Sequence, residues 1–495
     1  MIMPARCAPF RPTVQERPVS GAAAGGRCPR SIPRAGDVPN SAKIDCQPIT
    51  IRFREAALAL SVERGDEHSM LRILRITPHF YRPGRWPVAF DPVGGLQNQT
   101  WTIAQGLDTA GGVAQTVLTT YIPGGPRHVR LSPRLEVKCA GFWLPEFAAG
   151  PLMCFTWFLA ALPTLFRARH DFDLVHIHFN HSIWCRVMTV LLARLGMPVV
   201  VSMNTALWAG LQHALKLKGK PYDMTAWIER KALKSANRVV ALTERYRLEA
   251  DLEAGLGRRV SVIADAVDAE TFHCPLPVAD LRAFRAEHGI PDDRPIVSFI
   301  GRISPEKGWQ DLPRLVERLS AKGVFLLICG DGPDRRKLET ALAAISRPGS
   351  WAITGFVSPE EVKKAFRISR VMVLPSRREV LGSVLLEAMA AGVPAVAYAV
   401  GGVGDVAGIP PAFALVEQGE RDELIGRTLE LLDDGPTRQT FVRRARQRVR
   451  DFSVDLAVSL TLKLYNSVLA EVGCGSRGRT EQLAFQKDGG PPDGA

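Results

Sequence analysis

The chain has 495 residues, which is too long for a single hydrophobic core, so at least two domains are expected. Its hydrophobic fraction of 46% and charged fraction of 23% are those of an ordinary globular protein. The formal net charge of +13 favours anionic partners such as nucleotides or lipid headgroups. No compact Lys/Arg motif with interleaved aromatic residues is present, so nucleic acid is not an expected partner.

The cysteines argue for a reducing environment. There are nine, an odd number, and they are scattered without a Cys-x2-Cys pair or a histidine at zinc spacing. Free thiols in a cytoplasmic protein and no metal site are therefore predicted. The chain starts without an apolar stretch of the kind found in secretory signals, which agrees with a cytoplasmic location, including the inner face of the membrane.

Taken in order, the chain begins with residues 1–68, which are rich in Arg, Pro, Ala and Gly, show no sustained period and are predicted to be disordered. Apolar strand-like runs then alternate with helical patterns, at least seven times. This alternation predicts an α/β protein with two facing doubly wound parallel-sheet domains. The expected strands are 71–77, 115–120, 135–139, 173–178, 198–203, 238–243, 260–264, 296–300, 325–329, 353–357 and 370–374.

The expected division follows from this pattern. An N-terminal Rossmann-like domain spans 69–266, a linker 267–285 and a C-terminal Rossmann-like domain 286–451. A helix is predicted at 452–472, and the polar tail at 473–495 is predicted to be disordered.

An apolar run at 147–166 has no charged residue and just reaches the length of a membrane span. Pro151 and Pro163 interrupt it, and Arg167 follows directly. A core or interfacial helix is therefore favoured over a membrane span.

Two features of the first domain suit a ligand. Gly94 and Gly95 precede a helical pattern at 96–107, where exposed amides and the positive end of a helix dipole would suit a phosphate or a closely packed sugar. His178 ends the strand at 173–178, and ligands of open α/β sheets bind at the carboxyl ends of strands. An ordinary turn and a structural histidine are the respective alternatives.

The second domain begins with a strand at 296–300 that runs into Gly301, Arg302 and, five residues later, Lys307. A strand, a glycine loop and a helix with two cations in the loop suit a diphosphate: amides and the dipole supply direction, Arg302 a bidentate fork and Lys307 a point charge. The alternative is a solvated basic loop.

The stretch at 377–394 carries Glu379 and Glu387. It follows the strand-like run at 370–374 and contains strong helix formers between Gly382 and Pro394, so Glu379 is expected on a loop and Glu387 on a helix. Eight residues of helix would separate the two carboxylates by about 12 Å, more than the roughly 5 to 9.5 Å of a glycosidase pair. Such acids suit opposite ends of one elongated ligand, and a solvated acidic face is the alternative.

This stretch, EVLGSVLLEAMAAGVP, resembles the donor-binding segment of the retaining glycosyltransferases of family 4, which have the two-domain GT-B fold. The family pattern is Glu-x-Phe-Gly-x4-Glu followed by Ala-Met-Ala-x-Gly-x-Pro, and Leu381 stands here at the aromatic position. The loop from Gly301 to Gly308 likewise resembles the family's Gly-Arg-x4-Lys-Gly motif. The resemblance covers about residues 71 to 470 and is looser in the first domain.

The resemblance implies transfer of a sugar, with retention, from a nucleoside diphosphate sugar to an acceptor hydroxyl. No metal or cofactor is required, because Arg302 and Lys307 would neutralise the leaving diphosphate, whose oxygen takes the acceptor proton. Glu379 would hold donor sugar hydroxyls, Glu387 the ribose, and His178 would lie near the acceptor or donor sugar. The remaining implied substrate-binding residues are Gly94, Gly95, Gly301, Val357, Leu381, Gly382, Ser383 and Val384.

The chain departs from the family on the acceptor side and in turns: Asn204 replaces a frequent histidine, Asp265 and Ala266 replace Asn-Gly, and Asp405 replaces Glu. The acceptor stays open among a glycan, a lipid-linked molecule and a small molecule. Synthesis of a cell-envelope polysaccharide or glycolipid is expected from the resemblance, with peripheral membrane contact. A nucleotide-sugar epimerase of the same fold and a non-catalytic nucleotide-sugar-binding partner are the alternatives, and the intact donor residues favour catalysis.

Overall fold

The computed structural model describes residues 70–78, 80, 95–121, 125–141, 151–180, 182–205, 207, 219–345 and 348–485. The predicted disordered extension at 1–68, Gly94 and the start of the apolar run at 147–166 lie outside the described residues. Two parallel-sheet α/β lobes make up the fold, as the sequence predicts.

The first sheet has eight strands in the order β3-β4-β2-β1-β5-β6-β7-β8, parallel except for the β3–β4 pair. The sequence prediction missed β3, because its mostly polar residues lie half-exposed at the sheet edge and form no apolar run. The strands are β1 (Leu71–Ile76), β2 (Val113–Thr120), β3 (His128–Ser132), β4 (Leu135–Ala140), β5 (Leu174–Phe179), β6 (Val199–Met203), β7 (Arg238–Ala241) and β8 (Val260–Val262).

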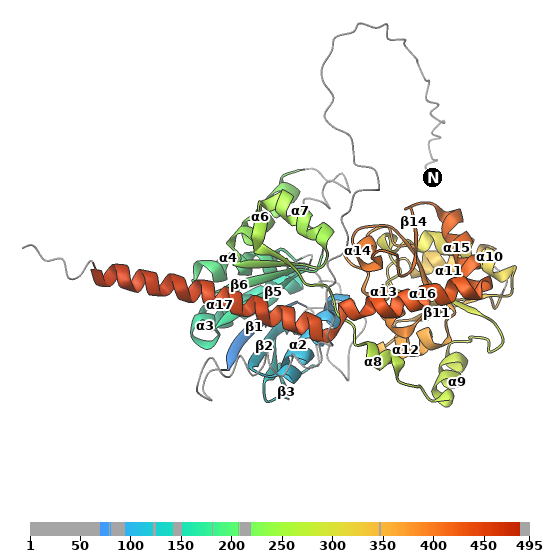
Figure 1. Ribbon diagram of the computed structural model, residues 1–495, viewed down its shortest axis with the longest axis horizontal. Helices are drawn as coiled ribbons and strands as arrows, with labels where there is room; N and C mark the ends of the chain where they lie inside the picture. The colour runs from blue at the N-terminus through green and yellow to red at the C-terminus, as the bar shows by residue number, and fades with distance from the viewer. Residues whose placement is uncertain are drawn as a thin grey trace, which may run out of the picture. The chain divides into compact units, whose positions relative to one another are not determined.

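Helices cover both faces of this sheet. One face carries Leu71 and Ile73 and packs against α2 (Gly95–Ala110) and the C-terminal helix α17 (Val454–Phe485), as Figure 1 shows. The opposite face is covered by α3 (Pro151–Asp171), α4 (Ile183–Arg194), α6 (Lys220–Ser235) and α7 (Glu244–Ala254).

Helix α3 contains most of the apolar run that the sequence left open between a core helix and a membrane span. Trp157, Ala161, Leu165 and Ala168 are fully buried at a helical spacing against the sheet. Within the described residues no helix has both the length and the apolar character that a bilayer crossing needs. The preferred interpretation, a core helix, therefore agrees with the structure.

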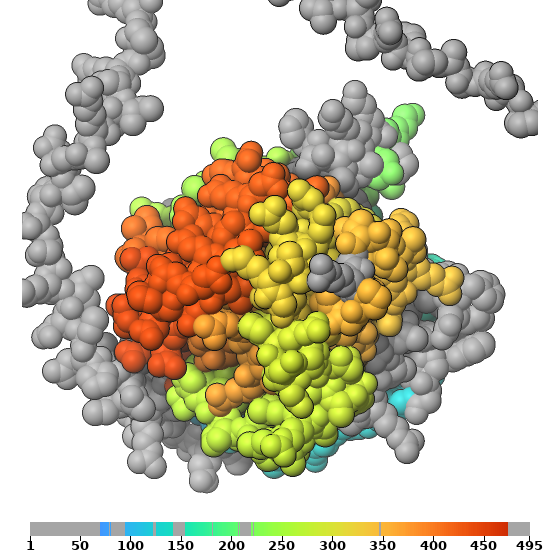
Figure 2. Space-filling model, turned by 90° about the vertical axis from the view of Figure 1, so that its right-hand side faces the viewer, coloured from blue at the N-terminus to red at the C-terminus, as the bar shows by residue number. Residues whose placement is uncertain are grey.

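The second sheet has six parallel strands in the order β11-β10-β9-β12-β13-β14. They are β9 (Ile296–Ile300), β10 (Phe325–Cys329), β11 (Trp351–Gly355), β12 (Val371–Leu374), β13 (Ala395–Tyr398) and β14 (Ala414–Val416). Figure 2 looks onto this lobe, with the region of α15 and α16 in red-orange and α9 in yellow-green. The helices are α9 (Val278–Glu287), α10 (Leu312–Ser320), α11 (Arg335–Ile345), α12 (Pro359–Ile368), α13 (Ser383–Ala391), α14 (Val403–Ala407), α15 (Arg421–Asp433) and α16 (Gly435–Arg448).

The predicted linker at 267–285 is not an unstructured connection. It contains α8 (Ala269–His273) and most of α9, and Phe284 of α9 is buried in the core of the second lobe. The composition of this segment hid the helix, because α9 is short and Phe284 is its only buried residue.

The C-terminal helix also differs from expectation. It was predicted at 452–472 with a disordered tail from 473, but α17 continues to Phe485. The added segment contains glycines but no proline, and a glycine costs only about 1 kcal/mol in a helix interior, so it weakens a helix without ending it. Leu462, Tyr465 and Val468 of α17 lie in the core of the first lobe, so the chain returns to that lobe with this helix.

Candidate functional site

The loop after β9 lies against the loop after β12. Gly308 has φ +69°, and a Cβ added there would lie 1.7 Å from the carbonyl oxygen of Pro375, so only glycine fits this approach. The Arg377 amide donates to the Glu306 carbonyl over 2.8 Å and joins the same two loops. The packing brings the predicted cation loop to the loop that carries Glu379.

Lys307 and Glu379 meet at this contact. Lys307 Nζ lies 2.7 Å from Glu379 Oε1, and Ser376 Oγ donates to the same oxygen over 2.8 Å. The glutamate side chain is 7% exposed, whereas the lysine side chain is 28% exposed and keeps donors for a further partner. Arg302 is exposed and, among the described residues, has no hydrogen-bond or ion-pair partner.

The main chain of Glu379 is held from two sides. The Gly402 amide donates to its carbonyl over 3.4 Å, and the Tyr246 hydroxyl of α7 donates to the same oxygen over 3.4 Å. A Cβ added at Gly401 would lie 1.7 Å from that oxygen. The position of the carboxylate is therefore set by close backbone packing as well as by Lys307.

Helix α13 begins next to this pair. Gly382 is its N-cap with φ +85° and supplies no side-chain cap, so the first amides and the positive end of the dipole are open to an anion. Ser383 Oγ donates to Asp265 Oδ2 over 2.5 Å, and a Cβ added at Gly95 would lie 3.2 Å from the same hydroxyl. The starts of α2 and α13 and the connection after β8 therefore converge.

Glu387 lies one turn further along α13. Only Ser383 to Glu387 of the interval from Glu379 is helical, so the separation estimated for eight helical residues does not apply. Burial raises the pKa of the Glu387 carboxyl to about 7, and the charge of Lys363 on α12 partly offsets this rise. The group changes charge near neutral pH.

Leu381 and Val357 were predicted to contact substrate. Leu381 is 1% exposed and belongs to the hydrophobic core, so its contact with substrate stays a prediction that concerns its backbone more than its side chain. Val357 follows β11 and is 8% exposed, which leaves mainly its backbone for a ligand.

Asp265 was noted in the sequence only as a departure in a turn. Its side chain is buried, Oδ1 has no partner among the described residues, and burial raises the pKa of the carboxyl to about 7 against the opposing effect of the Ser383 hydrogen bond. Its contact with Ser383 makes it part of the site. The signal that could have identified it was an acidic residue at a position where the family has an amide.

His178 lies one residue before the end of β5, close to the predicted carboxyl end, but its side chain is 3% exposed. Its Nε2 lies 2.9 Å from a guanidinium nitrogen of Arg75, and its Nδ1 lies 3.3 Å from Asn204 Oδ1. Both ring nitrogens have partners, so contact between His178 and a sugar stays a prediction. Arg75 was missed, although a charged residue within the apolar run LRILRI was a visible signal.

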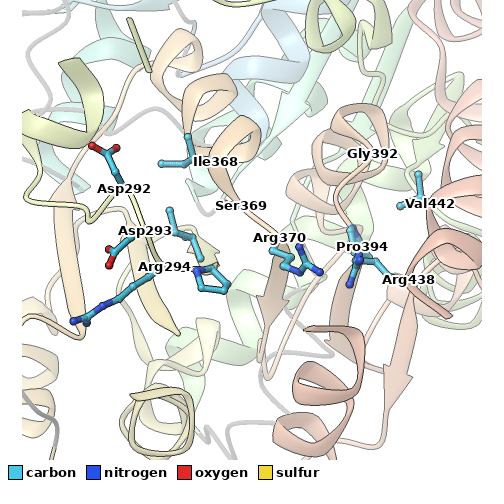
Figure 3. A pocket seen from close by; sticks show the side chains of 12 residues that line it. Asp292, Asp293, Arg294, Ile368, Ser369, Arg370, Gly392, Pro394, Arg438 and Val442 are labelled. Carbon is cyan, nitrogen blue, oxygen red and sulfur yellow. The ribbon is translucent and has the colours of Figure 1, made fainter. Parts of the chain in front are cut away.

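A pocket of about 510 Å³ lies at the opposite edge of the second sheet (Figure 3). It is lined by residues at the amino ends of β9, β12 and β13, among them Ile296, Arg370 and Pro394, and by Arg438 of α16. None of the predicted site residues lines it. The candidate site is therefore the carboxyl edge, where Arg302, Lys307, Glu379 and the start of α13 meet.

Comparison with known families and proteins identifies the family and the fold. The family described as Glycosyltransferase Family 4 matches residues 93–271, and the family described as Glycosyl transferases group 1 matches residues 280–448. Sucrose-phosphate synthase from Thermosynechococcus elongatus has the same fold, with a TM-score of 0.66 and 20% identity over 81% of this chain and 100% of that chain.

Relatives extend over most of both proteins. The chain is 32% identical to a 2-deoxystreptamine N-acetyl-D-glucosaminyltransferase of Streptomyces fradiae over 71% of this chain and 86% of the relative. It is 31% identical to a 2-deoxystreptamine glucosyltransferase of Streptomyces kanamyceticus over 73% of this chain and 96% of the relative. The chain belongs to the group 1, family 4 glycosyltransferases and has their GT-B fold.

Proposed function

We propose that this glycosyltransferase takes its sugar from a nucleoside diphosphate donor bound at the carboxyl edge of the second sheet. The observation that carries the proposal is the Lys307–Glu379 pair beside the uncapped start of α13. A diphosphate there would meet Lys307, Arg302 and the amides of Gly382 to Val384, while Glu379 accepts hydrogen bonds from sugar hydroxyls. Glu387 would accept from the ribose, and the backbone at Val357 and Gly301 would border the nucleotide.

Transfer with retention and without a metal is the mechanism we propose. Two cations and a helix N-terminus supply positive charge where negative charge develops on the leaving diphosphate. The acceptor hydroxyl attacks from the face that the diphosphate leaves, and its proton passes to a diphosphate oxygen as the bond to the sugar breaks. No covalent protein nucleophile takes part.

For the acceptor we propose a small aminocyclitol of the 2-deoxystreptamine kind, because two relatives that match over most of their length are named for that acceptor. This replaces the envelope polysaccharide or glycolipid expected from the sequence. Peripheral membrane contact stays a narrower proposal, supported by the exposed Leu159 and Phe166 of α3 beside Arg167. Sedimentation with vesicles containing anionic lipid tests that contact, and recovery of the protein in the supernatant contradicts it.

The function is tested with the full chain, a panel of UDP-, GDP- and ADP-sugars, and 2-deoxystreptamine as acceptor. Parallel reactions contain EDTA or added Mg²⁺. We expect one donor to yield a glycosylated product at equal rates in both, with the anomeric configuration of the donor retained by NMR.

Each measurement can contradict one part of the proposed function. If no donor raises the melting temperature of the protein and none is turned over, the proposed donor site is contradicted. Loss of activity in EDTA contradicts the metal-independent mechanism. An inverted product contradicts the same-face displacement. Donor hydrolysis without transfer to 2-deoxystreptamine contradicts the acceptor, and an envelope-glycan acceptor would then be tried.

A further inference from the structure

Arg75 is a buried charge without a counter-charge. It lies in the middle of the first sheet, on β1, and its side chain is fully buried. Its guanidinium contacts His178, the Gln115 side chain (3.3 Å) and the Tyr465 hydroxyl (3.2 Å), and Nε has no partner. No carboxylate of the described residues forms an ion pair with it. Burying a guanidinium in this way is costly, which calls for a role for the charge.

The contacts of Arg75 determine the tautomer of His178. An arginine can only donate, so Nε2 of His178 accepts, and the ring proton must be on Nδ1. Nδ1–H then donates to Asn204 Oδ1, and the Asn204 amide nitrogen donates to Gln99 Oε1 on α2. The result is a directed series of hydrogen bonds from Arg75 to the amides at the carboxyl edge.

A second series begins at the same guanidinium. Tyr465 Oη accepts from Arg75, so the tyrosine proton is directed to Nδ1 of His176, 2.7 Å away. Nε2–H of His176 then donates to Ser202 Oγ over 2.8 Å. His176 is therefore also neutral and has a fixed tautomer, and the two imidazoles stack with centroids 4.4 Å apart.

We propose that Arg75 is a positioning residue that holds His178 as a hydrogen-bond donor toward Asn204 and the acceptor side, and so excludes His178 as the base of the transfer reaction. This inference rests on the proposed function. The donor hydrogen of Nδ1 is available to Asn204, or to a sugar oxygen that replaces it, and the acceptor proton has to leave by the diphosphate oxygen. Asn204, at the position of a frequent family histidine, receives its orientation from this series.

The electrostatics agree with the geometry. Burial holds the pKa of His178 well below its usual range, and the charge of Arg75 lowers it further, while the Asn204 hydrogen bond acts in the opposite direction. Burial also lowers the pKa of His176, together with the charges of His178 and Arg75. Among the described residues, the titratable groups that contact this ring pair are Arg75 from β1 and Tyr465 from α17.

The test uses the full-length protein with the variant Arg75→Gln and the matched control Arg72→Gln. Arg72 is also on β1, but its side chain is 51% exposed and pairs with Asp173. Selective ¹⁵N labelling of histidine, with His178→Gln to assign the signals, reports the tautomer and titration of His178 by NMR. We expect Nδ1–H in the wild type and no titration at the ordinary histidine pKa of about 6.5. In Arg75→Gln we expect the pKa of His178 to rise, because the guanidinium charge is lost, while burial still holds it below its ordinary value.

Activity gives an independent measure. Arg75→Gln should lower kcat by about 10- to 100-fold, because the acceptor-side amides lose their orientation, whereas Arg72→Gln should keep wild-type kcat. An Nε2–H tautomer of His178 in the wild type overturns the proposal, as does a folded Arg75→Gln protein with wild-type kcat and an unchanged tautomer and pKa of His178. If Arg75→Gln does not fold, the wild-type tautomer decides alone. Because this readout needs no turnover, it stands apart from failure of the proposed transfer reaction.

Discussion

The carboxyl edges of the two sheets handle positive charge in opposite ways. At the second sheet, Arg302 is exposed and Lys307 keeps part of its surface beside an open helix start. At the first sheet, Arg75 is fully buried, and only neutral groups contact it. In the roles we propose, the charges that meet an anion are within reach of solvent, whereas the charge that orders neighbouring side chains is kept away from it. We therefore expect activity to be sensitive to substitutions that change charge at the second edge. At the first edge we expect substitutions to act mainly by changing the orientation of neighbouring side chains.

The largest effect on activity is expected at the second sheet, where the positive charges are exposed. Lys307→Ala should lower kcat/KM by about 100- to 1,000-fold, because one preorganised positive group at the diphosphate is lost. Steady-state kinetics measure this loss, and the melting temperature should change little. Lys322→Ala, which removes another exposed ion-paired lysine of the second lobe, is the control and should leave kcat/KM unchanged. Full activity of Lys307→Ala would contradict the assignment of Lys307 to the donor site.

A smaller loss is expected when the loop contact is disturbed without a change of charge. Gly308→Ala puts a Cβ against the Pro375 carbonyl, so the two loops must separate, and we expect a loss of about 10- to 100-fold in kcat. Gly323→Ala is the control, because Gly323 has nearly the same φ of +70° but nothing within 4 Å of its Cβ position. Equal losses in both variants would assign the effect to backbone strain instead of loop separation.

The pH dependence of nucleotide binding sharpens the comparison further. The carboxyl of Glu387 has a pKa of about 7, and a ribose hydroxyl donates best to its charged form. Diphosphate affinity should therefore fall about 10-fold from pH 8 to pH 6, since the fraction ionised falls by nearly that factor. Calorimetry with UDP, GDP and ADP measures it. Glu387→Gln should bind weakly with no such slope, and a slope that persists there would point to another group.

The smallest effect concerns stability. Asp265 has a folded pKa of about 7, above its unfolded value of 3.8, so the stability linked to its proton is complete at low pH and is lost as the pH rises through 7. Asp265→Asn keeps an acceptor for Ser383 without the buried charge. We expect a higher melting temperature at pH 8 and a smaller rise at pH 5, because at pH 5 only part of the linked stability has been lost. An equal shift at both pH values would contradict the assigned pKa.

The residues proposed for the donor lie in continuous segments, so the sequence alone could single them out. Gly301 to Gly308 and Glu379 to Pro394 each carry their residues at fixed spacing, and a diphosphate needs glycines and cations in such loops. Most strands were found from apolar runs for the same local reason, whereas β3, β13 and β14 were missed. The Ser383–Asp265 contact joins residues 118 positions apart, and no spacing rule predicts such a partner.

The residues on the proposed acceptor side were harder to predict from the sequence, because their partners are far apart in the chain. From the sequence, Arg75 is only a charged residue within an apolar strand. Its role depends on its hydrogen-bond partners, and one of them, Tyr465, is 390 residues away. Leu381 is the opposite case, since its place in a ligand-binding motif concealed that its side chain is in the core. The end of α17 was misjudged because glycine frequency is a weak guide to where a helix stops.

The return of α17 to the first lobe has a consequence for how the protein is made. Leu462, Tyr465 and Val468 complete a core that begins at Leu71, so the half synthesised first lacks part of its interior until the last helix leaves the ribosome. The second lobe draws its core from residues between 242 and 452 and does not wait for that helix. The second lobe can therefore complete its core first during translation, and the first lobe acquires its final packing only with α17.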